Sequence, residues 1–356
     1  MKLFITGICG FVGNSLARWM RESDANIQVS GMDNFLRPGS EGNRASLRSL
    51  GVEVRHGDVR NSSDFEGLGK ADWVIDCAAN PSVLAGADGK TSTRQLVEHN
   101  LGGTVNILEY CKRERAGLVL LSTSRVYSIN KLSSLAMRVR NDAFELDESR
   151  ALPEGVSARG IRPEFSTTAP VSLYGSTKLA SEVLALEYGE IFELPVWIDR
   201  CGVLAGAGQF GIAEQGIFSY WIHAYARKRP LKYIGFQGHG HQIRDAFHTY
   251  DLAALILDQM KAERSGSERI FNLGGGPENA MSLAQLTAWC SEKFGKHEVA
   301  QDPIPRRFDI PWVIMDYSRA TQVFGWRPQR RLGATLEELA RHAEENPNWL
   351  ERTCGI

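Results

Sequence analysis

The chain has 356 residues, which exceeds a typical single domain, so it is long enough to bury a large hydrophobic core. Its 41 basic and 42 acidic residues give a formal net charge of -1, which excludes an overall field that attracts nucleic acid or an anionic membrane. Six cysteines without a Cys-x-x-Cys pair indicate reduced, structural thiols, and the apolar start LFITGICGFVG is too short to span a bilayer and lacks a signal-peptide cleavage pattern. We therefore expect a cytoplasmic protein.

The first two hundred residues alternate strand-like and helix-like segments. Helical spacing of apolar residues runs from Gly13 to Arg21 and from Thr93 to Arg115. Parallel strands joined by helices predict an α/β fold with a doubly wound parallel (Rossmann) sheet. The β-branched or aromatic runs are KLFITG (2–7), IQVSGMD (27–33), VEVRHGD (52–58), WVIDCAA (73–79), LVLLSTS (118–124) and LPVWIDR (194–200).

Beyond about residue 201 the pattern changes to glycine-rich loops, with a helix near 216–228, a strand and helix near 246–260 and a short strand at IFNLGG (270–275). We expect a Rossmann domain over residues 1–200, to which later segments return, and a smaller, mainly substrate-binding lobe over 201–356. The polar segment 128–172 is long for a connection inside a compact domain, which indicates a functional or mobile segment.

A glycine turn between the first strand and helix is typical of a dinucleotide site. In Gly7-x-x-Gly10-x-x-Gly13 the backbone can turn tightly and approach a pyrophosphate closely. Asp33, at the end of the second strand, favours NAD over NADP, because a carboxylate accepts ribose hydroxyls and repels a 2'-phosphate. Arg37 weakens this inference, although Asp33 is better placed at the strand end. Asp58 ends the next strand and either reaches the adenine edge or is a plain strand-ending aspartate.

A Tyr-x-x-x-Lys spacing occurs twice. Tyr174 and Lys178 share one face of a helix, whereas nothing fixes the spacing of Tyr127 and Lys131 in a loop. The Lys178 ammonium, with a positively charged nicotinamide, is expected to lower the pKa of the Tyr174 phenol. Such an acid/base contributes roughly 10²- to 10⁴-fold to a rate. The pair predicts hydride transfer at a secondary alcohol.

Three hydroxyls at the end of LVLLSTS, from Ser122, Thr123 and Ser124, reach the carboxyl edge of the sheet, where ligands collect. Any one of them serves equally well to hold a substrate oxygen or to support structure. His239-Gly240-His241 lacks a third metal ligand at a suitable spacing, so no metal site is expected. His248 is expected to be structural.

The chain resembles the extended short-chain dehydrogenase/reductase superfamily, specifically its nucleotide-sugar epimerases. The resemblance covers essentially the whole chain and rests on GICGFVG, Asp33, HGD, CAA, Asn100-x-Gly-Gly-Thr, STSRVY, Tyr174-Gly-Ser-Thr-Lys178, IRDAFHTYD, FNLGG and GWRP. Within that group, the stretch from Gln209 to Gly216 and the segment before Tyr174 resemble the CDP-paratose (tyvelose) 2-epimerases.

The resemblance implies roles for individual residues. Thr123 binds the reacting oxygen, Tyr174 is the acid/base, and Lys178 activates it and binds the nicotinamide ribose. The nucleotide diphosphate meets Arg244 and Arg306, since guanidinium groups match phosphate oxygens; Ser124 completes the substrate set. The expected cofactor residues are Gly7, Gly10, Phe11, Val12, Gly13, Asp33, Asn34, Asp58, Val59, Ala78, Ala79, Asn100, Tyr174 and Lys178.

The activity so implied is an NAD-dependent epimerase that inverts a hydroxyl-bearing carbon of a nucleotide sugar by transient oxidation and hydride return. Related 4,6-dehydratases carry an Asp-Glu pair after the strand-end Thr, whereas this chain has Ser124 and Arg125, so elimination lacks its acid. C2 of a CDP-3,6-dideoxyhexose is the first expectation, with the C4 of a UDP-hexose or a net dehydrogenase or reductase as alternatives. A binding or redox-sensing protein is the non-enzymatic alternative, against which Tyr174 and Lys178 argue. The resemblance also implies a homodimer.

Overall fold

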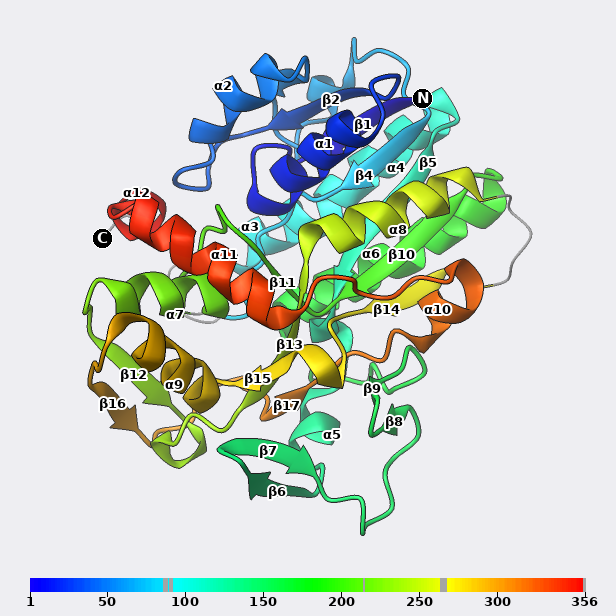
Figure 1. Cartoon of the computed structure of the whole chain (residues 1–356). Coiled ribbons are helices and arrows are strands. Elements are labelled where there is room, and N and C mark those ends of the chain that lie inside the picture. The colour runs from blue at the N-terminus through cyan, green and yellow to red at the C-terminus, as the bar shows by residue number, and fades with distance from the viewer. Residues whose placement is uncertain (86–88, 90–91, 214, 263–267, 355–356) are drawn as a thin grey trace.

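A seven-stranded parallel sheet forms the centre of the molecule, which confirms the predicted doubly wound fold (Figure 1). The computed structural model describes residues 1–85, 89, 92–213, 215–262 and 268–354. Every neighbouring pair of strands in this sheet is parallel. In sheet order the strands are β14 (Ile270–Leu273), β10 (Val196–Cys201), β5 (Gly117–Thr123), β4 (Trp73–Asp76), β1 (Lys2–Thr6), β2 (Gln28–Asp33) and β3 (Glu53–His56).

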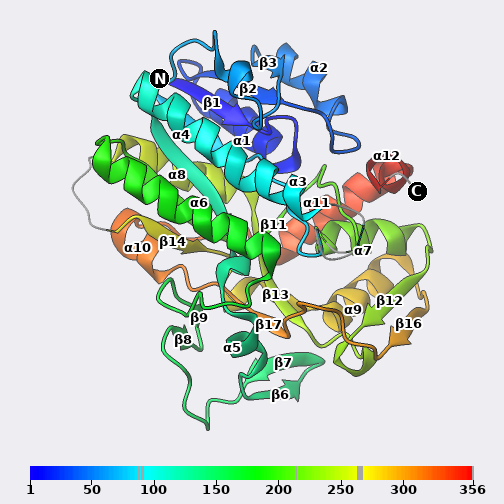
Figure 2. The same cartoon turned by 180° about the vertical axis from the view of Figure 1, so that it is seen from behind.

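Helices cover both faces of the sheet, so its strands are apolar on both sides. Figure 1 shows α1 and α8 in front of the sheet, and Figure 2 shows α4 and α6 in front of the opposite face. Between α3 and α4 lies one π-helical turn, η2, so the predicted helix from Thr93 to Arg115 forms with a bulge inside it. The bounds are α1 (Phe11–Ser23), α2 (Gly42–Ser49), α3 (Thr93–Val97), η2 (Glu98–Gly102), α4 (Gly103–Glu114), α6 (Ser172–Ile191), α8 (Thr249–Lys261) and α10 (Ser318–Phe324).

The segments that follow β10 divide between two layers. β14 and α8 complete the central sheet and its covering helices, whereas β13 joins a smaller sheet. The smaller sheet and its helices enclose a core of their own, around Phe218, Trp221 and Leu336. The domain boundary at residue 200 stays a prediction. The elements of this lobe are β11 (Val203–Ala205), α7 (Ile217–Ala226), β12 (Leu231–Ile234), β13 (Ile243–His248), β15 (Ala280–Ser282), α9 (Leu283–Phe294), β16 (Val299–Asp302), β17 (Trp312–Val313), α11 (Leu332–Glu345) and α12 (Trp349–Cys354).

The long polar segment 128–172 is a packed unit rather than a plain loop. It contains the short helix α5 (Ile129–Ser133) and two hairpins, which lie at the bottom of Figure 1. Its apolar residues, among them Phe165, pack against Tyr127 and Trp312 in a separate core. The hairpin strands are β6 (Met137–Arg140), β7 (Ala143–Leu146), β8 (Val156–Ser157) and β9 (Gly160–Ile161).

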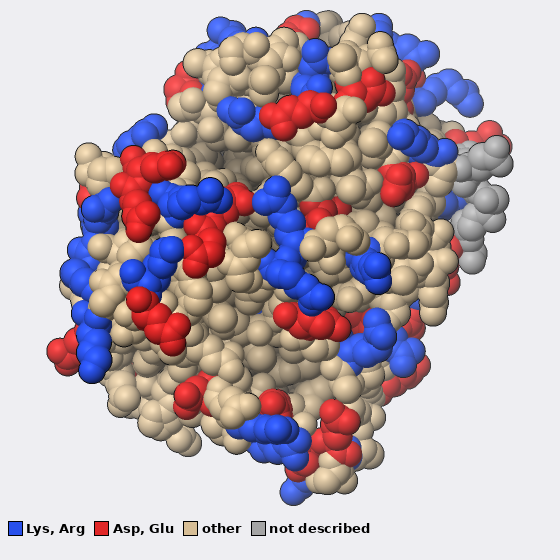
Figure 3. Space-filling view, in the orientation of Figure 1, with Lys and Arg blue, Asp and Glu red and all other residues tan. Residues whose placement is uncertain are grey.

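The surface carries both signs of charge. Figure 3 shows acidic and basic side chains interspersed over one face, in keeping with the balanced composition. Among the described residues, no helix is both long enough and apolar enough to cross a membrane.

A buried ion pair joins α6 to the central sheet. The guanidinium of Arg200 in β10 donates to the carboxylate of Glu182 in α6 at 2.6 Å, and neither side chain is more than 5% exposed. Ser122 in β5 donates to the same carboxylate, and Arg200 also donates to the Pro163 carbonyl at 3.0 Å. The pair thus fixes the helix on the sheet and on the segment that precedes it.

Replacing Arg200 by Met is expected to lower the free energy of unfolding by about 3–5 kcal/mol, because it leaves the Glu182 carboxylate buried without its partner. Chemical denaturation measures the change. The double variant Glu182→Gln/Arg200→Met should recover much of the loss. Arg138→Met, at a side chain that is 57% exposed, is the control and should change little. A loss at Arg200 no larger than at Arg138 would contradict the assignment.

Candidate functional site

A cavity of about 860 Å³ lies between the carboxyl ends of the central strands and the C-terminal lobe. This is the edge at which ligands bind in open α/β sheets. Most of the residues singled out from the sequence meet there: Gly7, Gly10, Phe11, Val12, Gly13, Asp33, Asn34, Val59, Ala78, Ala79, Thr123, Ser124, Tyr174, Lys178, Arg244 and Arg306 all line it.

The glycine turn presents bare backbone to this cavity. Gly7 has a φ of +62°, and a Cβ on Gly13 would lie 2.3 Å from the Gly7 carbonyl oxygen, so neither position accepts a larger residue without strain. No side chain caps the N-terminus of α1, whose first N–H groups remain available for an anion. The turn therefore fits a pyrophosphate.

Asp33 is held in place at the end of β2 by the turn itself. Its carboxylate accepts the Cys9 N–H at 2.9 Å and the Phe35 N–H at 2.8 Å, one on each oxygen. Burial raises the pKa of Asp33, and these backbone hydrogen bonds oppose the rise. The carboxylate keeps lone-pair capacity beyond these backbone contacts, so it fits a ribose hydroxyl of NAD.

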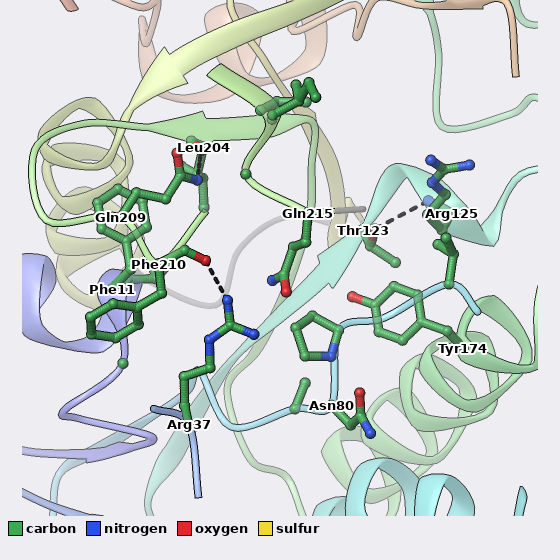
Figure 4. Close-up of a pocket in the computed structure, with 18 of the residues that line it drawn as sticks. Phe11, Arg37, Asn80, Thr123, Arg125, Tyr174, Leu204, Gln209, Phe210 and Gln215 are labelled. Atoms are coloured by element: carbon green, nitrogen blue, oxygen red, sulfur yellow. Dashed lines mark hydrogen bonds between the residues drawn. The ribbon is translucent and has the colours of Figure 1, made fainter. Parts of the chain in front are cut away.

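Arg37 reaches away from Asp33 to the opposite wall of the cavity. Its guanidinium donates to the Phe210 carbonyl in the C-terminal lobe (Figure 4). Phe210 stacks on Trp349 of α12 at 5.7 Å, and the Trp349 indole N–H donates to the Gln209 carbonyl at 2.9 Å. Arg37 thus links the two sides of the cavity.

Asp58 and Asn100 are not among the residues that line the cavity, although Asn34, Val59 and Arg60 beside Asp58 are, and their place beside the cofactor stays a prediction. The Asp58 carboxylate is held by Arg60 at 2.7 Å and by the Asn34 amide at 3.0 Å. Burial alone would raise the pKa of Asp58, but these hydrogen bonds lower it well below its ordinary value. Asn100, in the π-helical turn, accepts the Asn80 N–H at 2.8 Å and so fixes a residue that lines the cavity.

Tyr174 lies in the first turn of α6, next to the end of β5. The close approach depends on Gly175, where a Cβ would lie 2.2 Å from the Arg125 carbonyl oxygen. Burial raises the pKa of Tyr174 to about 12, against a hydrogen bond with Thr123 and the charge of Arg125. Arg125 thus favours the phenolate in this structure, and the expected contribution of Lys178 with a bound nicotinamide stays a prediction.

Lys178 is only 3% exposed and lines the cavity one helical turn after Tyr174. Its ammonium has no hydrogen-bond acceptor or ion-pair partner in the part of the chain that the structure describes. A buried ammonium without an acceptor is costly, and the hydroxyls of a ribose would satisfy it. Together with the glycine turn and Asp33, this residue shows that the cavity fits NAD.

The competing pair at Tyr127 does not reach the cavity. The Tyr127 hydroxyl is buried, donates to the Asn272 amide oxygen at 2.6 Å and accepts from Arg200, whereas Lys131 is exposed on α5. Tyr127 is a core residue, so the choice of Tyr174 agrees with the geometry.

The other half of the cavity is rich in guanidinium groups. Arg244 in β13 donates to the Ile310 carbonyl at 2.6 Å and lies 3.5 Å from the Asp309 carboxylate. Burial lowers the pKa of Arg244 to about 10, with a further contribution from the charge of Arg125. Arg306 donates to the Ala213 carbonyl at 3.3 Å.

Several polar residues of this wall escaped the sequence analysis. Arg125 follows directly on the strand-end hydroxyls, so the rule that ligands collect at strand ends could have found it. Asn80, Gln215 and Asp309 come from loops without a motif, and only the fold brings them to the cavity.

Known proteins match most of the chain. The NAD dependent epimerase/dehydratase family matches residues 3–274. CDP-paratose 2-epimerase of Salmonella typhi is 26% identical over 92% of this chain and 95% of its own length. UDP-glucuronate 4-epimerase 2 of Arabidopsis thaliana is 24% identical over 96% of this chain and 75% of its own length. Among solved structures, UDP-glucuronic acid 4-epimerase from Bacillus cereus superposes with a TM-score of 0.77 at 23% identity, covering 97% of this chain and 99% of that one.

Replacing Asp33 by Ala is expected to weaken NAD binding about 10- to 100-fold, because hydrogen bonds to a charged acceptor are worth about 1.5–3 kcal/mol. Calorimetry on cofactor-free protein measures the affinity. The affinity for NADP should fall far less than the affinity for NAD. Asp72→Ala is the control, because this exposed carboxylate precedes β4 and does not line the cavity, and it should leave NAD affinity unchanged. Thermal unfolding checks both variants, since Asp33 also orders the glycine turn. Unchanged NAD affinity would show that another group binds the ribose.

Proposed function

The chain belongs to the NAD dependent epimerase/dehydratase family, and we propose that within it the chain is a nucleotide-sugar epimerase. The observation that carries this proposal is the buried Tyr174 hydroxyl beside Thr123, at the end of a cavity that fits NAD. When bound, NAD supplies a reversible acceptor for the hydride of a sugar carbon.

The cofactor would be held by the glycine turn at its pyrophosphate, by Asp33 at one ribose and by Lys178 at the other. These groups come from β1, β2 and α6, so one set of rigid elements fixes both ends of the site. The positive charges of Lys178 and Arg125 would favour a negatively charged oxygen at the end of the cavity where Tyr174 lies.

The proton moves through Tyr174. Its phenolate accepts the proton of the sugar hydroxyl that is oxidised, and Thr123 donates a hydrogen bond to the same oxygen. Tyr174 would give the proton back to the same oxygen when the hydroxyl is formed again. Because burial raises the pKa of this phenol to about 12, nearby positive charge is needed to make it an effective base at neutral pH.

The acids of the cavity favour epimerisation over elimination. Among the described residues that line it, the only carboxylates are Asp33, at the cofactor end, and Asp309, which pairs with Arg244. Neither is adjacent in sequence to Thr123, where Ser124 and Arg125 stand. Among the described residues, no carboxyl group therefore stands beside Thr123 to protonate a leaving hydroxyl.

For the substrate we propose a CDP-3,6-dideoxyhexose that is inverted at C2. The support is the likeness to CDP-paratose 2-epimerase over nearly the full length of both proteins. Arg244 and Arg306 would bind the diphosphate. Inversion of a UDP-hexose at C4 is the second candidate, favoured by the likeness to UDP-glucuronate 4-epimerases.

Incubation of the purified protein with CDP-, UDP-, GDP- and dTDP-sugars in heavy water tests the proposal, with products identified by NMR. Epimerisation without deuterium at the inverted carbon is expected, since the hydride returns from the cofactor. Deuterium incorporation would indicate enolisation instead. Stoichiometric change at the nicotinamide absorbance band would identify a net dehydrogenase or reductase.

Replacing Tyr174 by Phe is expected to preserve NAD and substrate binding and to lower turnover by about 10²- to 10⁴-fold, the usual contribution of an acid/base. Steady-state kinetics and calorimetry separate the two effects. Tyr127→Phe is the matched control and should lower thermal stability while sparing the chemical step. A nearly normal rate in Tyr174→Phe would overturn the assignment.

A further inference from the structure

Arg125 is a half-buried cation at the reacting end of the cavity for which the likeness to other proteins supplies no role. It lies in η3 (Ser124–Val126), the single 3₁₀ turn that follows β5. Its side chain lines the cavity together with those of Thr123 and Tyr174.

Arg125 is anchored through its backbone to Thr123 and to Gly175, the residue that follows Tyr174. Its N–H donates to the Thr123 hydroxyl oxygen at 3.2 Å, the contact drawn in Figure 4. Its carbonyl oxygen packs against Gly175, so closely that a Cβ there would lie 2.2 Å away. The start of the arginine side chain is thus fixed relative to the two hydroxyls that would hold the reacting oxygen.

The guanidinium itself is only partly satisfied. Nη1 donates to the Phe308 carbonyl at 3.1 Å, and no other hydrogen bond of the guanidinium occurs in the described part of the chain. A guanidinium has five N–H donors in a planar fork. Most of them therefore remain for a ligand in the cavity.

The charges around Arg125 leave this end of the cavity positive. Burial lowers the pKa of Arg125, while the Asp309 carboxylate and the Tyr174 hydroxyl favour its charged form. Asp309 also faces Arg244, so a single negative charge lies beside two guanidinium groups. A ligand rich in oxygen atoms would offset the remaining positive charge.

Chain position distinguishes Arg125 from Arg244 and Arg306. Arg244 belongs to β13 and Arg306 to the loop after β16, both in the C-terminal lobe, whereas Arg125 follows directly on the strand that carries Thr123. The backbone contacts with Thr123 and Gly175 place Arg125 beside the hydroxyls that would hold the reacting oxygen, which favours the ring atoms next to that oxygen as its ligands.

We propose that Arg125 is a specificity-determining residue that donates hydrogen bonds to hydroxyl oxygens of the sugar ring beside the carbon that reacts. This inference rests on the proposed epimerase function. Binding in this manner orients the ring so that its reacting oxygen meets Thr123 and Tyr174. The same guanidinium adds positive charge next to the acid/base.

Calorimetry on the NAD-loaded protein tests the assignment with two matched pairs of probes, CDP-glucose with CDP and UDP-glucose with UDP. For the nucleotide that the unaltered protein binds, Arg125→Gln should weaken the nucleotide sugar at least tenfold and the free diphosphate less than twofold. Equal weakening of both probes would make Arg125 a diphosphate ligand and overturn the proposal. No weakening of either would show a purely structural residue. Arg138→Gln, on the exposed hairpin, is the control.

The pH profile of turnover provides a readout that a structural defect would not move. The groups that act on the Tyr174 phenol are Thr123 and Arg125, which favour the phenolate, and Cys201, which opposes it; Lys178 follows one helical turn later. Loss of the Arg125 charge raises the pKa of the phenol, so the rise of kcat/KM should move to higher pH in Arg125→Gln and return in Arg125→Lys. An unchanged pH profile in Arg125→Gln would overturn the claim that the charge of Arg125 acts on Tyr174.

The outcome also separates this inference from the function on which it depends. If the unaltered protein binds neither CDP-glucose nor UDP-glucose, the nucleotide-sugar function fails and the inference fails with it. If the unaltered protein binds and epimerises a nucleotide sugar while Arg125→Gln behaves like Arg138→Gln, only the assignment of Arg125 fails. Thermal unfolding confirms that the compared variants are folded.

Discussion

The contact between the end of β5 and the start of α6 determines the geometry of the site. Gly175 allows the backbone of Arg125 to touch the helix, and a side chain of any size there would force the two elements apart. Because of this contact, the hydroxyls of Thr123 and Tyr174 face the same end of the cavity although about fifty residues separate them in sequence. The Glu182–Arg200 ion pair holds the same helix further along. Acid/base chemistry needs a precise distance between these hydroxyls, and packing rather than flexible loops supplies it.

The cavity divides into two halves with different physical characters. The cofactor half consists of backbone N–H groups, one carboxylate and small residues, which suits a ligand that must lie close to the main chain. The substrate half presents the guanidinium groups of Arg125 after β5, Arg244 in β13 and Arg306 in the loop after β16, which suit phosphate and hydroxyl oxygens. Relatives that share the fold can differ in substrate, because a few contacts in this half set which ligand is bound.

The same division explains what the sequence reveals. Strand-and-helix alternation predicts the central sheet, and the glycine turn, Asp33, Tyr174 and Lys178 belong to motifs in which local spacing fixes the chemistry. The motif does not predict the orientation of the Asp58 and Arg37 side chains, because each depends on a partner outside it. Asp58 pairs with Arg60, and Arg37 donates to the carbonyl of Phe210. The segment 128–172 looks like a loop in sequence because its apolar residues pack against Trp312 and other residues far along the chain. Burial, which raises the pKa of Tyr174, likewise cannot be read from the spacing of a tyrosine and a lysine.

Trp349, near the C-terminus, supports one wall of a cavity whose lining residues all precede it in the chain. Every described residue that lines the cavity is numbered 313 or lower, yet the Gln209–Phe210 wall is supported by the indole of Trp349 in α12. A ribosome therefore completes the lining before it completes the support, and domains fold from the N-terminus as they emerge. The Gln209–Phe210 wall that Arg37 contacts can therefore take the packing seen here only once α12 is present to support it.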